Sequence, residues 1–181
     1  MTRTGLLVAC AALLSLASLA LAGPRPKASA PVPERAKPGT CLGYTWSFKA
    51  QQGKVGRVGS DVKLSNAYRG DTDCEVSLPL LCVHRTERPV PAGIEISQYS
   101  GWLGGEFALV GPLPGRELTS RKVADARCAE RLGAGWRMGE HHDGAGSVGW
   151  GFAGYGEVPS DVRFWVAIND QPANPWDSLS P

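Results

Sequence analysis

The chain has 181 residues, of which 43% are hydrophobic and 20% are charged, with 23 glycines, 14 prolines and five cysteines. Its formal net charge is +2. Residues 23–40 carry a net charge of +3, whereas residues 41–181 carry 14 basic and 16 acidic side chains. Because residues 41–181 have no basic excess, the composition excludes nucleic-acid binding through a positively charged surface.

Residues 1–22 are typical of a secretory signal peptide. Arg3 precedes an uncharged apolar run, and the small residues before Gly23 allow cleavage after Ala22. The run is about as long as a membrane span, so a retained anchor is the alternative. We expect a secreted or periplasmic protein with no stable membrane insertion after cleavage.

Residues 23–40 form a proline-rich segment that we expect to act as a tether. This segment has five prolines and no aromatic side chain, and it can bury too little apolar surface to offset the entropy of ordering. The remaining 141 residues, 41–181, suit a single domain with one hydrophobic core.

The first half of this domain is predicted to form strands separated by turns. Apolar residues there alternate with polar ones or form short runs between glycines and prolines. We expect Pro112 and Pro114 to end the last of these strands. The predicted strands are 44–48, 55–64, 78–84, 93–99 and 105–115, and two further extended segments are 136–138 and 162–168.

One helix is predicted within residues 118–135. Thr119 is its expected N-cap, and Gly133 is expected to end it. Three residues that lie four positions apart form its buried face: Ala124, Cys128 and Leu132. The whole pattern predicts an α+β fold, in which a small, disulfide-stabilised and mostly antiparallel sheet carries one or two helices.

Four cysteines lie beyond the signal peptide: Cys41, Cys74, Cys82 and Cys128. An even number in a secreted chain predicts two disulfides, for which three pairings are possible. We favour Cys74 with Cys82, because Pro79 can turn the short loop between them, and this leaves Cys41 with Cys128. A disulfide at Cys128 would fix the helix to the sheet. No Cys-x-x-Cys spacing points to a zinc knuckle or a redox pair.

The helix with Cys128, the segment "LGAGWRM" and the later run "FWVAIND" resemble the C-type lectin-like fold over residues 119–177. In that family the helix cysteine usually forms a disulfide, and the strand that "FWVAI" would match is central. The resemblance implies that Asp170 helps begin a loop that can bind calcium, and that Trp176 matches a tryptophan of the family. The family's sugar-binding signatures and its closing strands are missing here.

The most evident polar cluster consists of four adjacent residues: Glu140, His141, His142 and Asp143. Zinc needs three or four ligands at one point, and adjacent histidines on an extended chain point to opposite sides. A distant third ligand would therefore be required, such as Glu106, Glu157 or His84. The alternative is a tight turn at Asp143 and Gly144, with the histidines bonded to neighbouring backbone. We predict no cofactor, with calcium or zinc as the alternatives.

Aromatic residues and glycines gather after the helix. Seven of the 14 aromatic residues lie in the last third of the chain, and nine glycines lie between 133 and 156. Rings beside such flexible backbone can stack on a sugar or a peptide, and they can equally form a small core. We expect Trp150 and Tyr155 to be exposed and available for contact with a ligand. Phe164 and Trp165 lie on one predicted strand, and we expect them in the core and at its edge.

These patterns predict a binding or interaction module rather than an enzyme, with an extracellular carbohydrate or protein as its partner. We expect the ligand at the loops 139–156 and 169–177. The candidate contact residues are Glu140, His141, His142, Asp143, Trp150, Tyr155, Asp170 and Trp176. One alternative is a metal-dependent hydrolase centred on His141, His142 and Asp143. Another is a structural subunit of an envelope or surface assembly.

Overall fold

The computed structural model describes residues 41–179, so the expected signal peptide and tether lie outside the described residues. The larger strands are β2 (Thr45–Gln52), β3 (Val55–Gly59), β5 (Ser77–Arg85), β6 (Gly101–Pro114), β8 (Gly151–Tyr155) and β9 (Arg163–Trp165). The short strands are β1 (Leu42–Gly43), β4 (Thr72–Asp73) and β7 (Arg137–Met138). The helices are the 3-10 turn η1 (Gly115–Glu117), α1 (Arg121–Leu132) and α2 (Pro175–Leu179).

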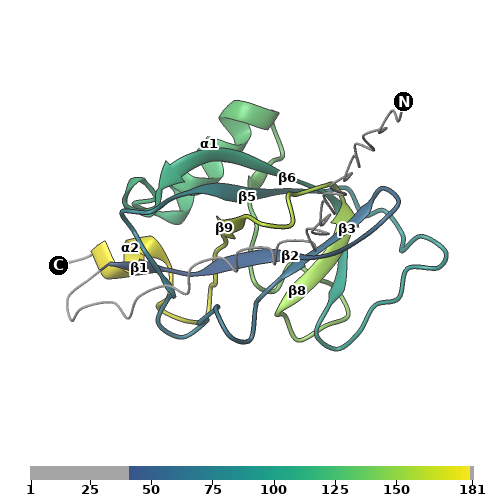
Figure 1. The fold of residues 1–181 in the computed structure, drawn as a ribbon. Helices are drawn as coiled ribbons and strands as arrows, with labels where there is room; N and C mark the ends of the chain where they lie inside the picture. The colour runs from purple at the N-terminus through teal and green to yellow at the C-terminus, as the bar shows by residue number, and fades with distance from the viewer. Residues whose placement is uncertain (1–40, 180–181) are drawn as a thin grey trace, which may run out of the picture. The chain divides into compact units, whose positions relative to one another are not determined.

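Six of these strands form a closed, barrel-like sheet (Figure 1). Their order is β6, β8, β3, β2, β9 and β5, and β5 pairs back onto β6 to close the ring. The contacts of β6 with β8 and of β5 with β9 are parallel, and the other contacts in the ring are antiparallel. Strand β7 extends the sheet beside β5, and β1 with β4 forms a separate two-stranded sheet.

The main core fills the interior of this ring, because all six strands send apolar side chains into one buried cluster. Strand β5 is buried on both faces, as its uninterrupted apolar run allows. Leu81 and Val83 belong to the interior cluster, whereas Leu80 and Cys82 belong to a second cluster that lies against α1. Successive side chains of a strand point to opposite faces, so the orientation of Cys82 follows from its position in β5.

The two disulfides join Cys41 to Cys74 and Cys82 to Cys128, so the predicted pairing is wrong. Strand β1 pairs with β4, and the backbone N–H of Cys74 donates to the carbonyl of Cys41, which brings these two cysteines together. Cys82 faces α1 and therefore meets Cys128. Pro79 lies at an irregularity within β5, between Leu78 and Leu80, and does not form the predicted turn.

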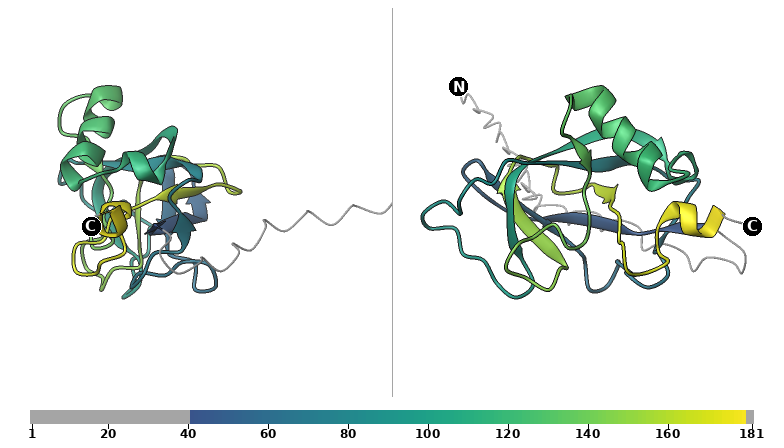
Figure 2. Two further views of the ribbon diagram at one scale, coloured as in Figure 1. Left: turned by 90° about the vertical axis from the view of Figure 1, so that its left-hand side faces the viewer. Right: turned by 180° about the vertical axis from the view of Figure 1, so that it is seen from behind.

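The helix prediction is confirmed in its position and for two of the three residues of its buried face, since Leu132 at the end of the helix is only half-buried. Helix α1 packs against β5, β6 and β7, with Ala124 and Cys128 fully buried (Figures 1 and 2). Gly133 ends it with φ at 105°, a value that glycine adopts without steric cost. The N-cap is Ser120 instead of Thr119, because the Ser120 hydroxyl accepts the backbone N–H of Val123.

Three strand predictions are wrong. The strand predicted at 55–64 ends at Gly59 as β3, and residues 62–64 form a turn. Residues 93–99 form a loop with one isolated bridge, between Ser97 and Ser100, since β3, β6 and β8 already have partners on both edges in the ring. Strand β6 continues through Pro112 to Pro114. Its pairing with β8 lies near the start of β6, so the missing N–H groups of these prolines remove no bond on that side.

The predicted α+β class is confirmed at the level of a mostly antiparallel sheet with two short helices and two disulfides. The closed ring is not clearly that of a C-type lectin-like domain. Disulfides are typical of an oxidising, extracellular environment. Among the described residues, no helix has the length and apolar character needed to cross a membrane.

Candidate functional site

The polar cluster from Glu140 to Asp143 is a tight turn held by its own side chains. The backbone N–H of Asp143 donates to the carbonyl of Glu140 (3.0 Å), so the turn lies just before the predicted position at Asp143 and Gly144. The buried Glu140 carboxylate accepts the backbone N–H groups of His142 (2.7 Å) and Asn169 (3.0 Å). Glu140 therefore ties the turn to the segment that follows β9.

Asp143 anchors the other end of the turn. Arg137 of β7 pairs with both oxygens of the buried Asp143 carboxylate, with 2.9 Å between Nη1 and Oδ2. The same Oδ2 accepts the backbone N–H of Glu140 at 2.7 Å. A carboxylate in a two-pronged pair with an arginine is firmly oriented, so Asp143 serves the local structure.

His141 is buried among aromatic side chains, beside the core of the closed sheet. Its Nε2 accepts the backbone N–H of Trp150 (3.3 Å), so its Nδ1 carries the proton and donates to the hydroxyl of Tyr44 (3.1 Å). The imidazole centre lies 5.7 Å from the ring centre of Tyr44, 5.9 Å from that of Trp46 and 5.3 Å from that of Trp150. His141 thus connects the core to the backbone of Trp150.

The environment of His141 keeps its imidazole neutral. Burial, followed by the neighbouring His142, lowers the pKa of His141 to about 4, against the opposing effects of Glu140 and Asp170. Burial also raises the pKa of the Tyr44 hydroxyl above its ordinary value. Both groups are therefore uncharged near neutral pH. His142 is exposed instead, with its Nδ1 3.0 Å from Glu140 Oε1 and its Nε2 3.7 Å from Asp170 Oδ2.

Trp150 has an unusual backbone conformation, with φ at +76°. A non-glycine residue in this region is strained, and such strain is concentrated at functional sites. Two bonds hold the backbone there: the N–H donates to His141, and the carbonyl accepts the N–H of Ser60 at 2.7 Å. The preceding Gly149 also has a positive φ, and a Cβ on it would lie 2.5 Å from the His141 ring. These two bonds hold the Trp150 backbone, and the indole, which was predicted to be exposed, is half-buried against the core.

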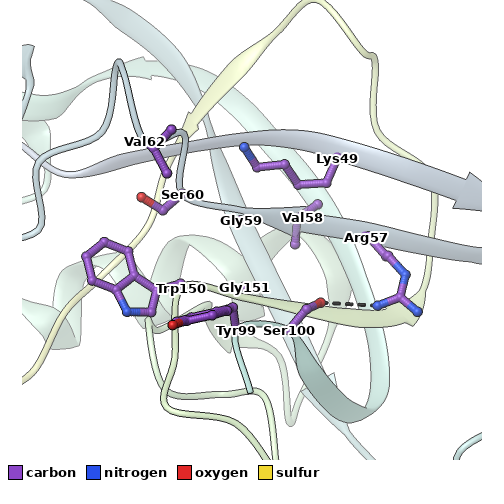
Figure 3. A pocket seen from close by; sticks show the side chains of 10 residues that line it. All are labelled: Lys49, Arg57, Val58, Gly59, Ser60, Val62, Tyr99, Ser100, Trp150 and Gly151. Atoms are coloured by element: carbon purple, nitrogen blue, oxygen red, sulfur yellow. Dashed lines mark hydrogen bonds between the residues drawn. The ribbon is translucent and has the colours of Figure 1, made fainter. Parts of the chain in front are cut away.

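The indole lines an open cleft with a volume of about 500 Å³, which we name the Trp150 cleft. The cleft is mainly apolar, and the side chains of Trp150 and Tyr99 lie across from those of Lys49 and Arg57 (Figure 3). Tyr99 is 61% exposed and Val62 is 93% exposed. The residues that line the cleft are Lys49, Arg57, Val58, Gly59, Ser60, Val62, Tyr99, Ser100, Trp150 and Gly151.

A pair of glycines lies beside the indole in the wall of this cleft. Gly59 of β3 is directly opposite Gly151 of β8. A Cβ on Gly59 would lie 2.6 Å from the carbonyl oxygen of Trp150, and one on Gly151 would lie 2.7 Å from that of Val58. The two strands therefore approach too closely for any side chain at these positions, which leaves the adjacent part of the cleft open.

The other predicted contact residues lie outside the Trp150 cleft. Tyr155 is half-buried and lines a separate open cleft of about 580 Å³, where the Arg88 guanidinium lies 5.2 Å from its ring centre. Trp176 is partly buried against the cluster below α1, and Asp170 is exposed beside His142. Phe164 and Trp165 are both fully buried in the core. The structure thus separates Trp150 from Tyr155, which the sequence analysis placed on one surface.

The predicted metal ligands do not converge. Among residues 41–179, no group of three or more His, Cys, Asp or Glu side chains is arranged to hold a metal ion. Both ring nitrogens of His141 and both carboxylate oxygens of Asp143 already contact the protein. Glu106, Glu157 and His84, named as distant ligands, do not contact the turn in any described hydrogen bond or ion pair.

Most of the residues that line the Trp150 cleft have no local sequence signal. Lys49, Arg57, Ser60 and Tyr99 come from β2, from β3 and its following loop, and from the loop before β6. Each of these residues is ordinary in its local pattern, and only the closure of the ring brings them together. The one local signal is the glycine-rich run around Trp150, where flexible backbone beside an aromatic contact residue was expected.

The chain was compared with known proteins at three levels. No protein-family model, no curated protein and no solved structure matches it. The functional conclusion therefore depends on the geometry of the described residues.

Proposed function

We propose that this chain is a binding module of the extracellular space or the periplasm, which holds a carbohydrate or protein ligand in the Trp150 cleft. The observation that carries this proposal is the strained backbone of Trp150, which holds a large ring in an open, mainly apolar cleft. Aromatic side chains in such positions supply much of the binding energy of ligands.

Exposed apolar side chains beside the cleft support the same proposal. Val62 and Tyr99 line the cleft, and Ile96 and Val148 lie in the two loops that border it. The backbone N–H of Val148 donates to the carbonyl of Gln98, so these loops are in contact. Neighbouring exposed apolar groups are characteristic of interaction surfaces.

The turn from Glu140 to Asp143 supports the cleft and is not proposed as its ligand-binding part. His141 holds the backbone of Trp150, and Glu140 and Asp143 hold the turn that presents His141. Because these groups are engaged within the protein, the geometry favours a binding module over the metal-dependent hydrolase. The proposal does not require a C-type lectin-like fold, which stays a prediction.

The test compares ligand retention by three alanine variants. Immobilised protein is exposed to the native extracellular mixture, and the retained material is quantified. Trp150→Ala and Tyr99→Ala should each reduce retention at least about tenfold, as expected for aromatic anchors. Tyr68→Ala is the matched control, since Tyr68 is also 61% exposed and does not line the cleft. Equal retention by all three variants would refute the proposal.

A further inference from the structure

The Trp150 cleft is positively charged, whereas residues 41–181 as a whole are slightly negative. Two cations, Lys49 and Arg57, line it together with no acidic residue, whereas residues 41–181 carry a net charge of −2. Lys49 lies at an irregularity in the pairing of β2 with β3, and such bulges reorient a side chain. This local excess of positive charge complements an anionic ligand.

The charge of Arg57 is not neutralised within the described residues. Its guanidinium donates to the Ser100 hydroxyl (3.2 Å) and to the backbone carbonyl of Glu95, and both acceptors are neutral oxygens. These bonds orient the guanidinium and leave its charge available. Lys49 has only a loose ion pair, with 3.8 Å between its Nζ and Asp61 Oδ2. Both cations are therefore available to a carboxylate in the cleft.

Ser60 belongs to the wall of the cleft and not to its ligand-facing surface. It is 8% exposed, and its backbone N–H donates to the carbonyl of Trp150. Its Oγ atom is shielded from solvent and lies near the fully buried Tyr44 hydroxyl, where it opposes the effect of burial on the pKa of that phenol. Recognition in the cleft therefore depends on the indole and the two cations.

From these observations we propose that the Trp150 cleft binds an acidic carbohydrate that contains uronic-acid residues. A sugar ring stacks on the indole of Trp150, and its carboxylate pairs with Arg57 and Lys49. This inference rests on the proposed function and names its ligand class.

A carbohydrate fits the cleft better than an extended peptide does. The strands that line it are β2, β3 and β8, and in the wall of the cleft they pair with one another, β3 with β2 on one edge and with β8 on the other. A peptide in the cleft therefore meets a sheet of paired strands, whereas a common mode of peptide recognition adds the peptide to a free strand edge. A sugar ring that carries a carboxylate uses both the aromatic side chains and the cations that the cleft presents.

The test uses oligogalacturonate and oligoglucuronate, each beside its methyl ester, which keeps the sugar and removes the charge. An acidic peptide of similar charge is the third probe. Isothermal titration should show binding of one of the acidic sugars at least about tenfold tighter than of its ester. Arg57→Gln should remove most of that preference, and Lys49→Gln should reduce it. Arg69→Gln, an exposed arginine outside the cleft, should leave the preference unchanged.

Three results would overturn the inference. Equal binding of acid and ester would exclude recognition of the carboxylate, and preferential binding of the acidic peptide would exclude a carbohydrate. In both cases, loss of binding in Trp150→Ala would leave the proposed function standing. Failure of both acidic sugars to bind would overturn the inference as well, and the proposed function would then be judged by retention of native ligands in Trp150→Ala and Tyr68→Ala.

Discussion

Protonation of His141 should destabilise the protein and release Trp150. The pKa of the buried imidazole is about 4, against 6.5 for the ordinary side chain. Because the folded-state pKa is the lower one, the unfolded chain binds a proton more readily over this range. The contribution of His141 to stability is therefore complete above pH 6.5, and it is lost as the pH falls toward 4.

The size of this effect follows from the shift in pKa. Each pKa unit corresponds to about 1.4 kcal/mol, so the whole shift amounts to about 3 kcal/mol. Between about pH 7 and about pH 4.5, linkage of the two pKa values gives a loss of about 2 kcal/mol. The charged ring would also present a proton to the N–H of Trp150, so the bond that holds the strained backbone would break.

Urea unfolding at these two pH values measures the effect, with His141→Gln as the reference. The Gln side chain can accept the N–H of Trp150 and does not titrate, and the carboxylates of the protein contribute equally in both forms. The wild type should lose about 2 kcal/mol more of its free energy of unfolding than the variant does. If both proteins lose the same free energy of unfolding between the two pH values, His141 is not the neutral, buried imidazole described above.

Three other substitutions test the framework, each by urea unfolding near neutral pH. Cys128→Ser breaks the disulfide between α1 and β5 and should lower the free energy of unfolding by about 2–5 kcal/mol. A smaller loss would show that the packing of α1 does not depend on this disulfide. Arg163→Met removes the ion-pair partner of the buried Asp71 carboxylate, whose Oδ1 lies 2.9 Å from Arg163 Nη2. This change should lower the free energy of unfolding by about 3–5 kcal/mol. The second change Asp71→Asn should restore part of that loss. Gly149 has a φ of +98° and no room for a Cβ, so Gly149→Ala should lower the free energy of unfolding by about 1–3 kcal/mol. An unchanged free energy of unfolding would contradict the described contact with His141.

The elements with strong local patterns were predictable from sequence. Helix α1 follows from the spacing of Ala124 and Cys128 and from the stop at Gly133, which are local properties of the chain. The segment 93–99 shows the limit of such patterns, because its alternation is typical of a strand although the ring offers it no free edge. Strand formation needs a partner, and a partner is decided by the fold.

The disulfides and the cleft depend on the fold in the same way. Cys82 meets Cys128 because its position in β5 directs it toward α1, and no spacing between cysteines contains that information. The turn from Glu140 to Asp143 was predictable as a turn, but its role was not. His141 in this turn accepts the backbone N–H of Trp150 and so supports that residue. Lys49 and Arg57 became candidates only when the closed sheet placed them in one cleft with Trp150.

Mapping of backbone amide chemical shifts tests the Trp150 cleft most directly. The protein is labelled with nitrogen-15 and titrated with oligogalacturonate and oligoglucuronate. We expect the largest changes at residues 57–62, 99–100 and 149–151, which line or adjoin the cleft. Changes confined to the turn 140–143 or to the cleft around Tyr155 would contradict this expectation, because they would place the binding site elsewhere.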